Sequence, residues 1–86
     1  MSEQFNFSDI IEVTTLKDYQ LHIKFADGAE GIVDIAKLVP FEGIFEPLKD
    51  KTYFDRVTIN KDIGTICWEN GADISPALLY KSIRNK

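Results

Sequence analysis

The sequence predicts an α+β fold, in which a small antiparallel β-sheet of four to five strands, a β-meander plus a hairpin, packs against one C-terminal helix and a short helical turn. Three observations predict it. Short segments alternate apolar and polar residues, Asp-Gly and Asn-Gly dipeptides mark sharp turns, and a Ser-Pro begins one amphipathic segment near the end. With 86 residues, we expect a single domain over residues 9–86 and a loosely ordered N-terminal arm over residues 1–8.

Three segments form the expected meander. The first strand covers residues 9–15 and alternates with a period of two. One of its faces holds Ile11 and Val13. The second strand, residues 19–25, has the most regular alternation in the chain. Its apolar face holds Tyr19, Leu21, Ile23 and Phe25. Asp27-Gly28 is a strong hairpin signal, and residues 30–35 return as the third strand.

The middle of the chain is less regular. Residues 36–54 predict an irregular crossing, because Pro40, Gly43 and Pro47 interrupt any helical or strand pattern. Near its end, Asp50 is a suitable N-cap for a short helical turn.

A second hairpin follows this crossing. Residues 55–60 and 65–68 alternate as strands and are separated by a short turn. The alternation directs Ile66 and Trp68 inward and therefore places Cys67 on the opposite face.

The stretch GTICWENGADISPALLY, residues 64–80, predicts a joint between a strand and a helix. Asn70-Gly71 tolerates positive φ, so the chain can turn sharply there. Ser75-Pro76 is the arrangement of an N-cap followed by proline at the first helical position. Ile74 and Leu79 have the spacing of a hydrophobic staple. The helix has only about ten residues, so it must lie on the sheet to persist. Its buried face is expected to hold Leu79, Tyr80 and Ile83.

Composition excludes several classes of function. The net charge is −4 and the sequence pI is about 4.8, which opposes a broad phosphate-binding surface for nucleic acid. No apolar run approaches the roughly 20 residues that span a bilayer, and the N-terminus does not resemble a signal peptide. One cysteine and one histidine cannot form an internal disulfide or a structural zinc site. We therefore expect a soluble, cytoplasmic protein without a cofactor.

The chemically reactive side chains form no catalytic motif. No nucleophile elbow, phosphate loop or dinucleotide fingerprint is present. His22 lies on the polar face of its strand and is interpreted as a solvated side chain, and Cys67 as a small strand residue. Glu69 and Asp73 flank the Asn-Gly turn, and paired carboxylates can do acid–base work or bind a hard cation. No further ligand run accompanies them, so we expect no catalytic and no metal-binding residue.

The residues from Phe45 to Tyr80, FEPLKDKTYFDRVTINKDIGTICWENGADISPALLY, resemble a family of small bacterial proteins catalogued as domain of unknown function 2442. The shared pattern comprises Asp-Gly, Val-Asp, Phe-x-Pro-Leu-x-Asp, Gly-x-Ile-x-Trp, Asn-Gly-x-Asp and Leu-Tyr. Glu69 departs from it, since the family commonly has Pro there. The resemblance implies an α+β fold and no established activity. Relatives are often encoded beside another small protein, in an arrangement similar to toxin–antitoxin pairs.

These observations favour a non-catalytic protein-interaction module, an antitoxin-like partner of another small protein. A homodimer is a further expectation, whereas direct nucleic-acid binding and membrane association are not expected. The candidate interaction or motif residues are Trp68, Asn70, Gly71, Asp73 and Tyr80. The alternative is a small-molecule or metal-binding domain, or a minor enzyme, centred on Trp68, Glu69 and Asp73. A third reading is a DNA-binding regulator that acts only through a partner.

Overall fold

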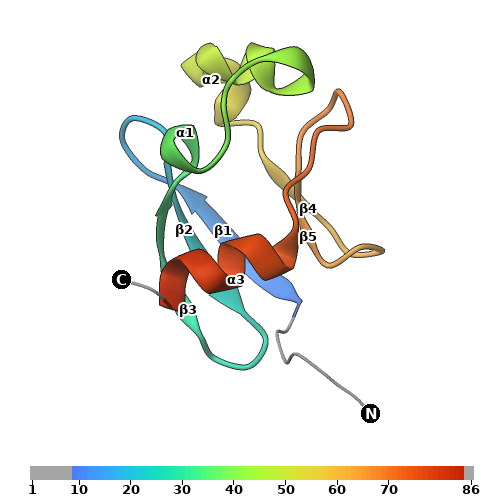
Figure 1. Ribbon diagram of the computed structural model, residues 1–86. Helices are drawn as coiled ribbons and strands as arrows, with labels where there is room; N and C mark the ends of the chain where they lie inside the picture. Colours follow the sequence, from blue (N-terminus) through green and yellow to red (C-terminus); the bar gives the residue numbers. More distant parts are fainter. Residues whose placement is uncertain (1–8, 85–86) are drawn as a thin grey trace.

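The computed structural model describes residues 9–84, and Figure 1 shows how their helices and strands are arranged. The expected N-terminal arm, residues 1–8, lies outside the described residues. The elements are β1 Ile10–Thr15, β2 Gln20–Phe25, β3 Glu30–Asp34, α1 Ile35–Leu38, the 3₁₀ helix η1 Gly43–Lys49, α2 Lys51–Phe54, β4 Thr58–Asn60, β5 Thr65–Cys67 and α3 Pro76–Arg84.

The predicted meander is confirmed. Strands β1, β2 and β3 form an antiparallel sheet in sequence order. At the β2–β3 turn, Asp27 Oδ1 accepts a hydrogen bond from Ala29 N at 2.9 Å, which is the local bonding that makes Asp a turn residue. The third strand ends at Asp34 and not at Ile35, because Ile35 begins α1 and its carbonyl accepts from Val39 N at 3.0 Å.

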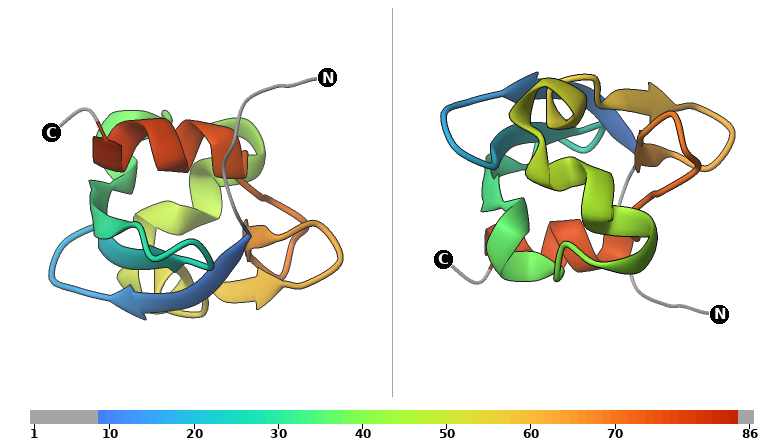
Figure 2. Two further views of the ribbon diagram at one scale, coloured as in Figure 1. Left: turned by 90° about the horizontal axis from the view of Figure 1, so that it is seen from below. Right: turned by 90° about the horizontal axis from the view of Figure 1, so that it is seen from above.

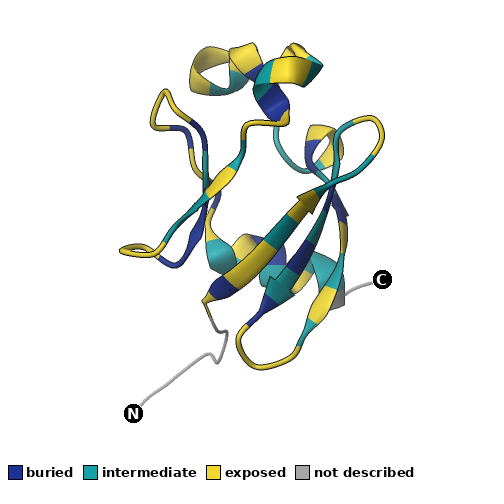
Figure 3. Ribbon diagram, turned by 180° about the vertical axis from the view of Figure 1, so that it is seen from behind, coloured by how far each residue is buried: buried dark blue, intermediate teal, exposed yellow. Residues whose placement is uncertain are grey.

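The second hairpin forms a sheet of its own, so the prediction of one continuous sheet needs correction. Strands β4 and β5 pair only with each other. A bulge between Ile10 and Glu12 bends β1. Ile10 N donates to Gly64 O at 3.0 Å, and the second hairpin lies alongside β1 without joining its sheet (Figure 3). The five predicted strands are therefore present, divided between a three-stranded and a two-stranded sheet.

Strand β4 also starts later than its sequence predicts. Arg56 N donates to Tyr53 O at 3.0 Å and Val57 N to Phe54 O at 3.3 Å, so these residues complete the end of α2. The predicted cap of this helix is confirmed, since Asp50 Oδ1 accepts from Thr52 N at 3.0 Å. The helical turn thus takes up the first residues of the expected strand.

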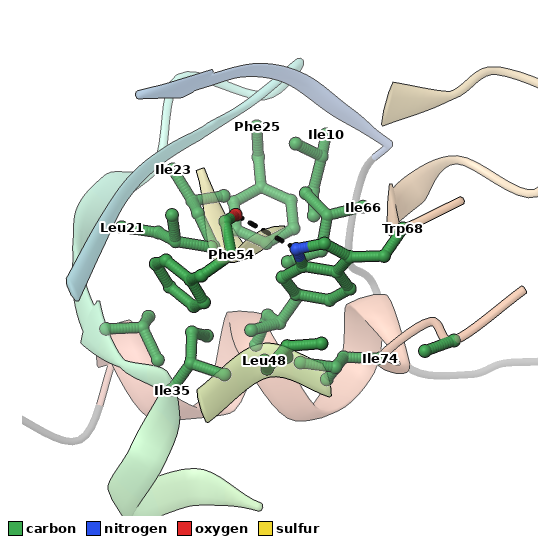
Figure 4. Packing of buried hydrophobic residues seen from close by; sticks show 13 residues of the cluster. Ile10, Leu21, Ile23, Phe25, Ile35, Leu48, Phe54, Ile66, Trp68 and Ile74 are labelled. Carbon is green, nitrogen blue, oxygen red and sulfur yellow. Dashed lines mark hydrogen bonds between the residues drawn. The ribbon is translucent and has the colours of Figure 1, made fainter. Parts of the chain in front are cut away.

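The core lies between the meander and α3. Seen from below in Figure 2, α3 runs along one side of the core and β1 and β2 lie on the other. An added Cβ at Gly31 would stand 3.0 Å from Ile83 Cβ, so glycine permits the close approach of β3 and α3. Figure 4 shows the buried cluster. It holds Ile10, Leu21, Ile23, Phe25, Val33, Ile35, Leu48, Phe54, Ile66, Trp68, Ala72, Ile74 and Leu79.

Candidate functional site

Trp68 lies at the end of β5 and is a core residue. Its side chain is 2% exposed, and its ring lies 5.9 Å from that of Phe54, centroid to centroid. Its Nε1–H donates to Phe54 O at 3.0 Å, the dashed line in Figure 4. A buried indole needs such an acceptor, and the Phe54 carbonyl at the end of α2 accepts this bond in addition to the one from Val57 N. Trp68 therefore joins the hairpin to α2 and offers no surface to a partner.

Asn70 joins three segments of the chain. Its side-chain Oδ1 accepts from Ala72 N at 3.0 Å, and its Nδ2 donates to Ile44 O of η1 at 2.8 Å. Its backbone N donates to the Tyr53 hydroxyl of α2 at 3.0 Å. The side chain stands at the surface, but its hydrogen-bonding groups are engaged. The sequence signalled only the local turn, because the other two partners lie 17 and 26 residues away.

Gly71 has the backbone conformation that the Asn-Gly pair predicts. Its φ is +90°, in the region that L side chains rarely adopt, although nothing lies within 4 Å of an added Cβ. Gly71 N donates to Trp68 O at 3.0 Å and Trp68 N donates to Ala72 O at 2.9 Å. The requirement for glycine here is conformational and not a matter of space.

The two acids of the stretch do not converge on one site. The Glu69 carboxylate pairs with the Arg56 guanidinium, and these side chains are 56% and 58% exposed. Asp73 is exposed, and its backbone forms an isolated β-bridge with Cys67. In the described part of the chain no group of three His, Cys, Asp or Glu side chains is placed to hold a metal ion. Trp68 is buried in the core, whereas Glu69 and Asp73 are exposed at the surface.

Tyr80 and Ser75 fix α3. The ring of Tyr80 meets Phe25 edge-on at 4.9 Å between centroids, and its hydroxyl donates to Asp27 Oδ2 at 2.7 Å. The predicted N-cap is confirmed by a long hydrogen bond of 3.4 Å from Leu78 N to Ser75 Oγ. Both residues of the predicted staple, Ile74 and Leu79, are buried. The stretch from Gly64 to Tyr80 thus connects β5 to α3 and has a structural role.

The remaining reactive side chains have simple partners. His22 lies on the outer face of the meander, half-buried, with its Nε2 3.1 Å from Glu30 Oε1. Cys67 is half-buried beside Thr58, with Sγ and Oγ1 3.6 Å apart. His22 thus has a carboxylate partner, and Cys67 has a hydroxyl neighbour.

A surface that the sequence did not reveal lies between β1 and the β4–β5 turn. A hollow of about 420 Å³ is lined by Asp9, Ile10, Ile11, Ile59, Lys61 and Gly64. Alternation placed Ile11 and Val13 on one face of the strand, but only Val13 packs against the core. The bulge in β1 turns Ile10 into the core and leaves Ile11 50% exposed. Ile63, next to the lining residue Gly64, is 48% exposed.

Among residues 9–84 no helix is long and apolar enough to cross a membrane.

One comparison with known proteins found a match, and two found none. Neither the curated proteins nor the solved structures gave a significant match. The family model described as "Protein of unknown function (DUF2442)" matches residues 10–85. The match covers almost all of the chain, and the motifs that carried the resemblance lie within it. The chain belongs to the DUF2442 family.

Proposed function

We propose that this chain is a non-catalytic protein-interaction module, and that its contact surface is the hollow beside β1 with its exposed isoleucines. The observation that carries the proposal is Ile11, which lines the hollow and is 50% exposed; Ile63, next in sequence to the lining residue Gly64, is 48% exposed. Exposed apolar side chains that gather around a hollow are typical of a protein contact. Ile10 and Ile59 extend the apolar lining inward.

The side chains of the sequence motif support the same proposal indirectly. Trp68, Asn70 and Tyr80 are each engaged within the fold by hydrogen bonds. Glu69 is paired with a guanidinium. These contacts indicate that the motif residues stabilise the connection between β5 and α3, and they do not favour a ligand-binding role. A partner is therefore better sought at the apolar surface than at the motif.

The partner proposed is another small protein of basic character. The chain carries a net charge of −4, and opposite charge accelerates the encounter of two proteins and favours the correct pairing. A cytoplasmic pairing of an antitoxin-like acidic chain with a basic partner fits this charge. It also fits the expectation drawn from the family resemblance.

The test is affinity capture from cells that contain the native gene, read by quantitative mass spectrometry. Wild type is compared with Ile11→Glu, which places a charge in the hollow. The matched control is Ile44→Glu, because Ile44 is 51% exposed on η1 and lines no part of the hollow. Thermal melts establish that each variant is folded.

We expect one small basic protein to be enriched by wild type and by Ile44→Glu, and lost with Ile11→Glu. The purified pair should then reassociate in size-exclusion chromatography. Equal recovery with Ile11→Glu, or no reproducible protein at all, would contradict the proposed surface.

A further inference from the structure

We propose that the Asn70–Gly71 pair is a deamidation site that the folded chain holds in an unreactive geometry. It reacts when the β5–α3 connection, residues 68–75, separates from η1 and α2. The inference goes beyond the proposed function, because the reaction needs no partner protein. It is carried by the hydrogen bonds of Asn70 and Gly71 with η1, α2 and the end of β5.

The reaction is intramolecular, and water is its only co-reactant. The backbone nitrogen of Gly71 bonds to Cγ of Asn70 and loses its proton to solvent. The side-chain nitrogen Nδ2 takes up a proton and leaves as ammonia, so that a succinimide ring remains. Water then opens this ring at either carbonyl, which gives aspartate or isoaspartate at position 70. Glycine has no Cβ to hinder the ring closure, so an Asn-Gly pair is the most favourable sequence for it.

The residue after the asparagine distinguishes this site from Asn60. Asn60 Oδ1 accepts from Asp62 N at 2.9 Å, which is the same local bond that Asn70 Oδ1 makes with the second residue after it. Asn60, however, is followed by Lys61, whose side chain hinders attack by the backbone nitrogen. Asn70 and the glycine after it are exposed, so water reaches them. Asn60 is therefore an internal reference for the reaction at Asn70.

The first constraint of the fold acts on the attacking nitrogen. Gly71 N donates its hydrogen to Trp68 O at 3.0 Å. In the succinimide, Asn70 Cγ takes the place of that hydrogen on the nitrogen. Ring closure therefore requires the peptide plane to rotate until its N–H direction meets Cγ, and this rotation breaks the bond to Trp68 O. Trp68 is 2% exposed and bonded to Phe54 O through its indole, so its carbonyl is held in place.

The second constraint acts on the side-chain amide of Asn70. Its Nδ2 donates to Ile44 O at 2.8 Å, and its Oδ1 accepts from Ala72 N at 3.0 Å. Both ends of the amide are thus fixed, and turning Cγ toward the attacking nitrogen breaks both bonds. The backbone N of Asn70 is also held, by the Tyr53 hydroxyl of α2 at 3.0 Å. Reaction is restricted to a locally open state, in which the connection has left the two helices beside it in Figure 1.

The products hinder a return to the original geometry. Either product carries a carboxylate at position 70, which cannot donate a hydrogen bond to Ile44 O. Isoaspartate also adds a methylene to the backbone. The turn depends on backbone length, since Gly71 has a φ of +90° and Trp68 N donates to Ala72 O at 2.9 Å. A chain that has opened and reacted is therefore marked at residue 70 and is less stable than before.

The experiment compares deamidation rates of the full-length chain at mildly alkaline pH, folded in buffer and unfolded in guanidinium chloride. Peptide mapping by mass spectrometry follows Asn70 and the reference Asn60, with fragmentation that distinguishes aspartate from isoaspartate. Tyr53→Phe removes the hydroxyl that accepts from Asn70 N. Tyr80→Phe is the matched control, because it also loses one tyrosine hydroxyl bond, to Asp27 Oδ2 in the β2–β3 turn. Thermal melts establish that both variants are folded.

We expect Asn70 to react well ahead of Asn60 in the unfolded chain. In the folded chain, Asn70 should react at least about tenfold more slowly than in the unfolded chain, because ring closure breaks three hydrogen bonds. Tyr53→Phe should raise the rate in the folded chain about twofold to tenfold, whereas Tyr80→Phe should leave it near the wild-type rate. The isoaspartate product, separated by ion exchange, should melt below both fresh chain and Asn70→Asp.

Three results would overturn the inference. Equal rates at Asn70 in the folded and unfolded chain would show that the fold does not restrain the site. No reaction at Asn70 in the unfolded chain would remove the site. A Tyr53→Phe rate equal to that of Tyr80→Phe would show that separation from α2 does not control the reaction. The assay contains no partner protein, so each of these failures leaves the proposed function standing.

Discussion

Replacing Asn70 with alanine should destabilise the fold. Melting experiments can detect this effect, so no functional assay is needed. The change removes the bond from Ala72 N to Asn70 Oδ1 and the bond from Asn70 Nδ2 to Ile44 O. The bond between Asn70 N and the Tyr53 hydroxyl is made by the backbone and is kept. At about 0.5–1.5 kcal/mol for each lost bond, and with a surface side chain at the lower end, the expected loss is about 1–2 kcal/mol.

Thermal and denaturant melts measure this loss directly. For a domain of 86 residues, 1 kcal/mol moves the melting temperature by about 4–8 °C, so Asn70→Ala should lower it by roughly 5–15 °C. Asn70→Asp is the matched variant, because it keeps the acceptor for Ala72 N and loses the donor to Ile44 O. It should show about half the effect.

The neighbour Glu69 supplies a baseline for these melts. Glu69→Gln weakens one exposed ion pair with Arg56, and such pairs contribute about 0–1 kcal/mol. We therefore expect it to change the melting temperature least of the three variants. An Asn70→Ala protein that melts like wild type would refute the interpretation that the Asn70 side chain stabilises the fold through its hydrogen bonds. If Asn70→Ala instead raises the melting temperature, Asn70 has a binding role, because functional residues are often kept at some expense of stability.

Four further predictions follow from the same structure. Trp68→Ala should lower the free energy of unfolding by about 3–5 kcal/mol in denaturant melts, since it opens a cavity in a core that is closed around the indole. Gly71→Val should lower it by about 1–2 kcal/mol or more because φ is +90°, and an unchanged midpoint would mean that the turn rearranges. Zinc or calcium should raise the melting temperature very little, and saturable stabilisation abolished by Asp73→Ala would reveal a site. The chain alone should not bind generic duplex DNA at physiological salt, and micromolar binding with a steep salt dependence in a fluorescence titration would disprove this.

The parts of the fold that the sequence predicted are those governed by neighbouring residues. The alternation of residues 19–25 and the Asp27-Gly28 turn led directly to β2 and its hairpin with β3. The Ser75-Pro76 cap and the Asn70-Gly71 turn could likewise be predicted from the sequence, because each depends on contacts within a few residues. Local hydrogen bonding and local φ preferences determine these features.

The parts that could not be predicted depend on contacts between distant segments. The bulge that exposes Ile11 leaves no mark in a simple apolar and polar pattern, because the inserted residue is itself apolar. The division into two sheets likewise has no signal in the local sequence. For the motif, the sequence pointed to Asn70 and Trp68 but not to their partners Ile44 and Phe54, which tertiary packing brings in.

The position of α3 against the meander has a consequence for how the chain is made. On the ribosome β1, β2 and β3 emerge first and can pair at once, because their contacts are local. The core that holds Leu21, Ile23 and Phe25 of β2 is complete only when the residues from Pro76 onward, which supply Leu79, have been translated. A nascent or prematurely terminated chain would therefore display a formed sheet with an incompletely covered apolar face, a natural substrate for chaperones and proteases.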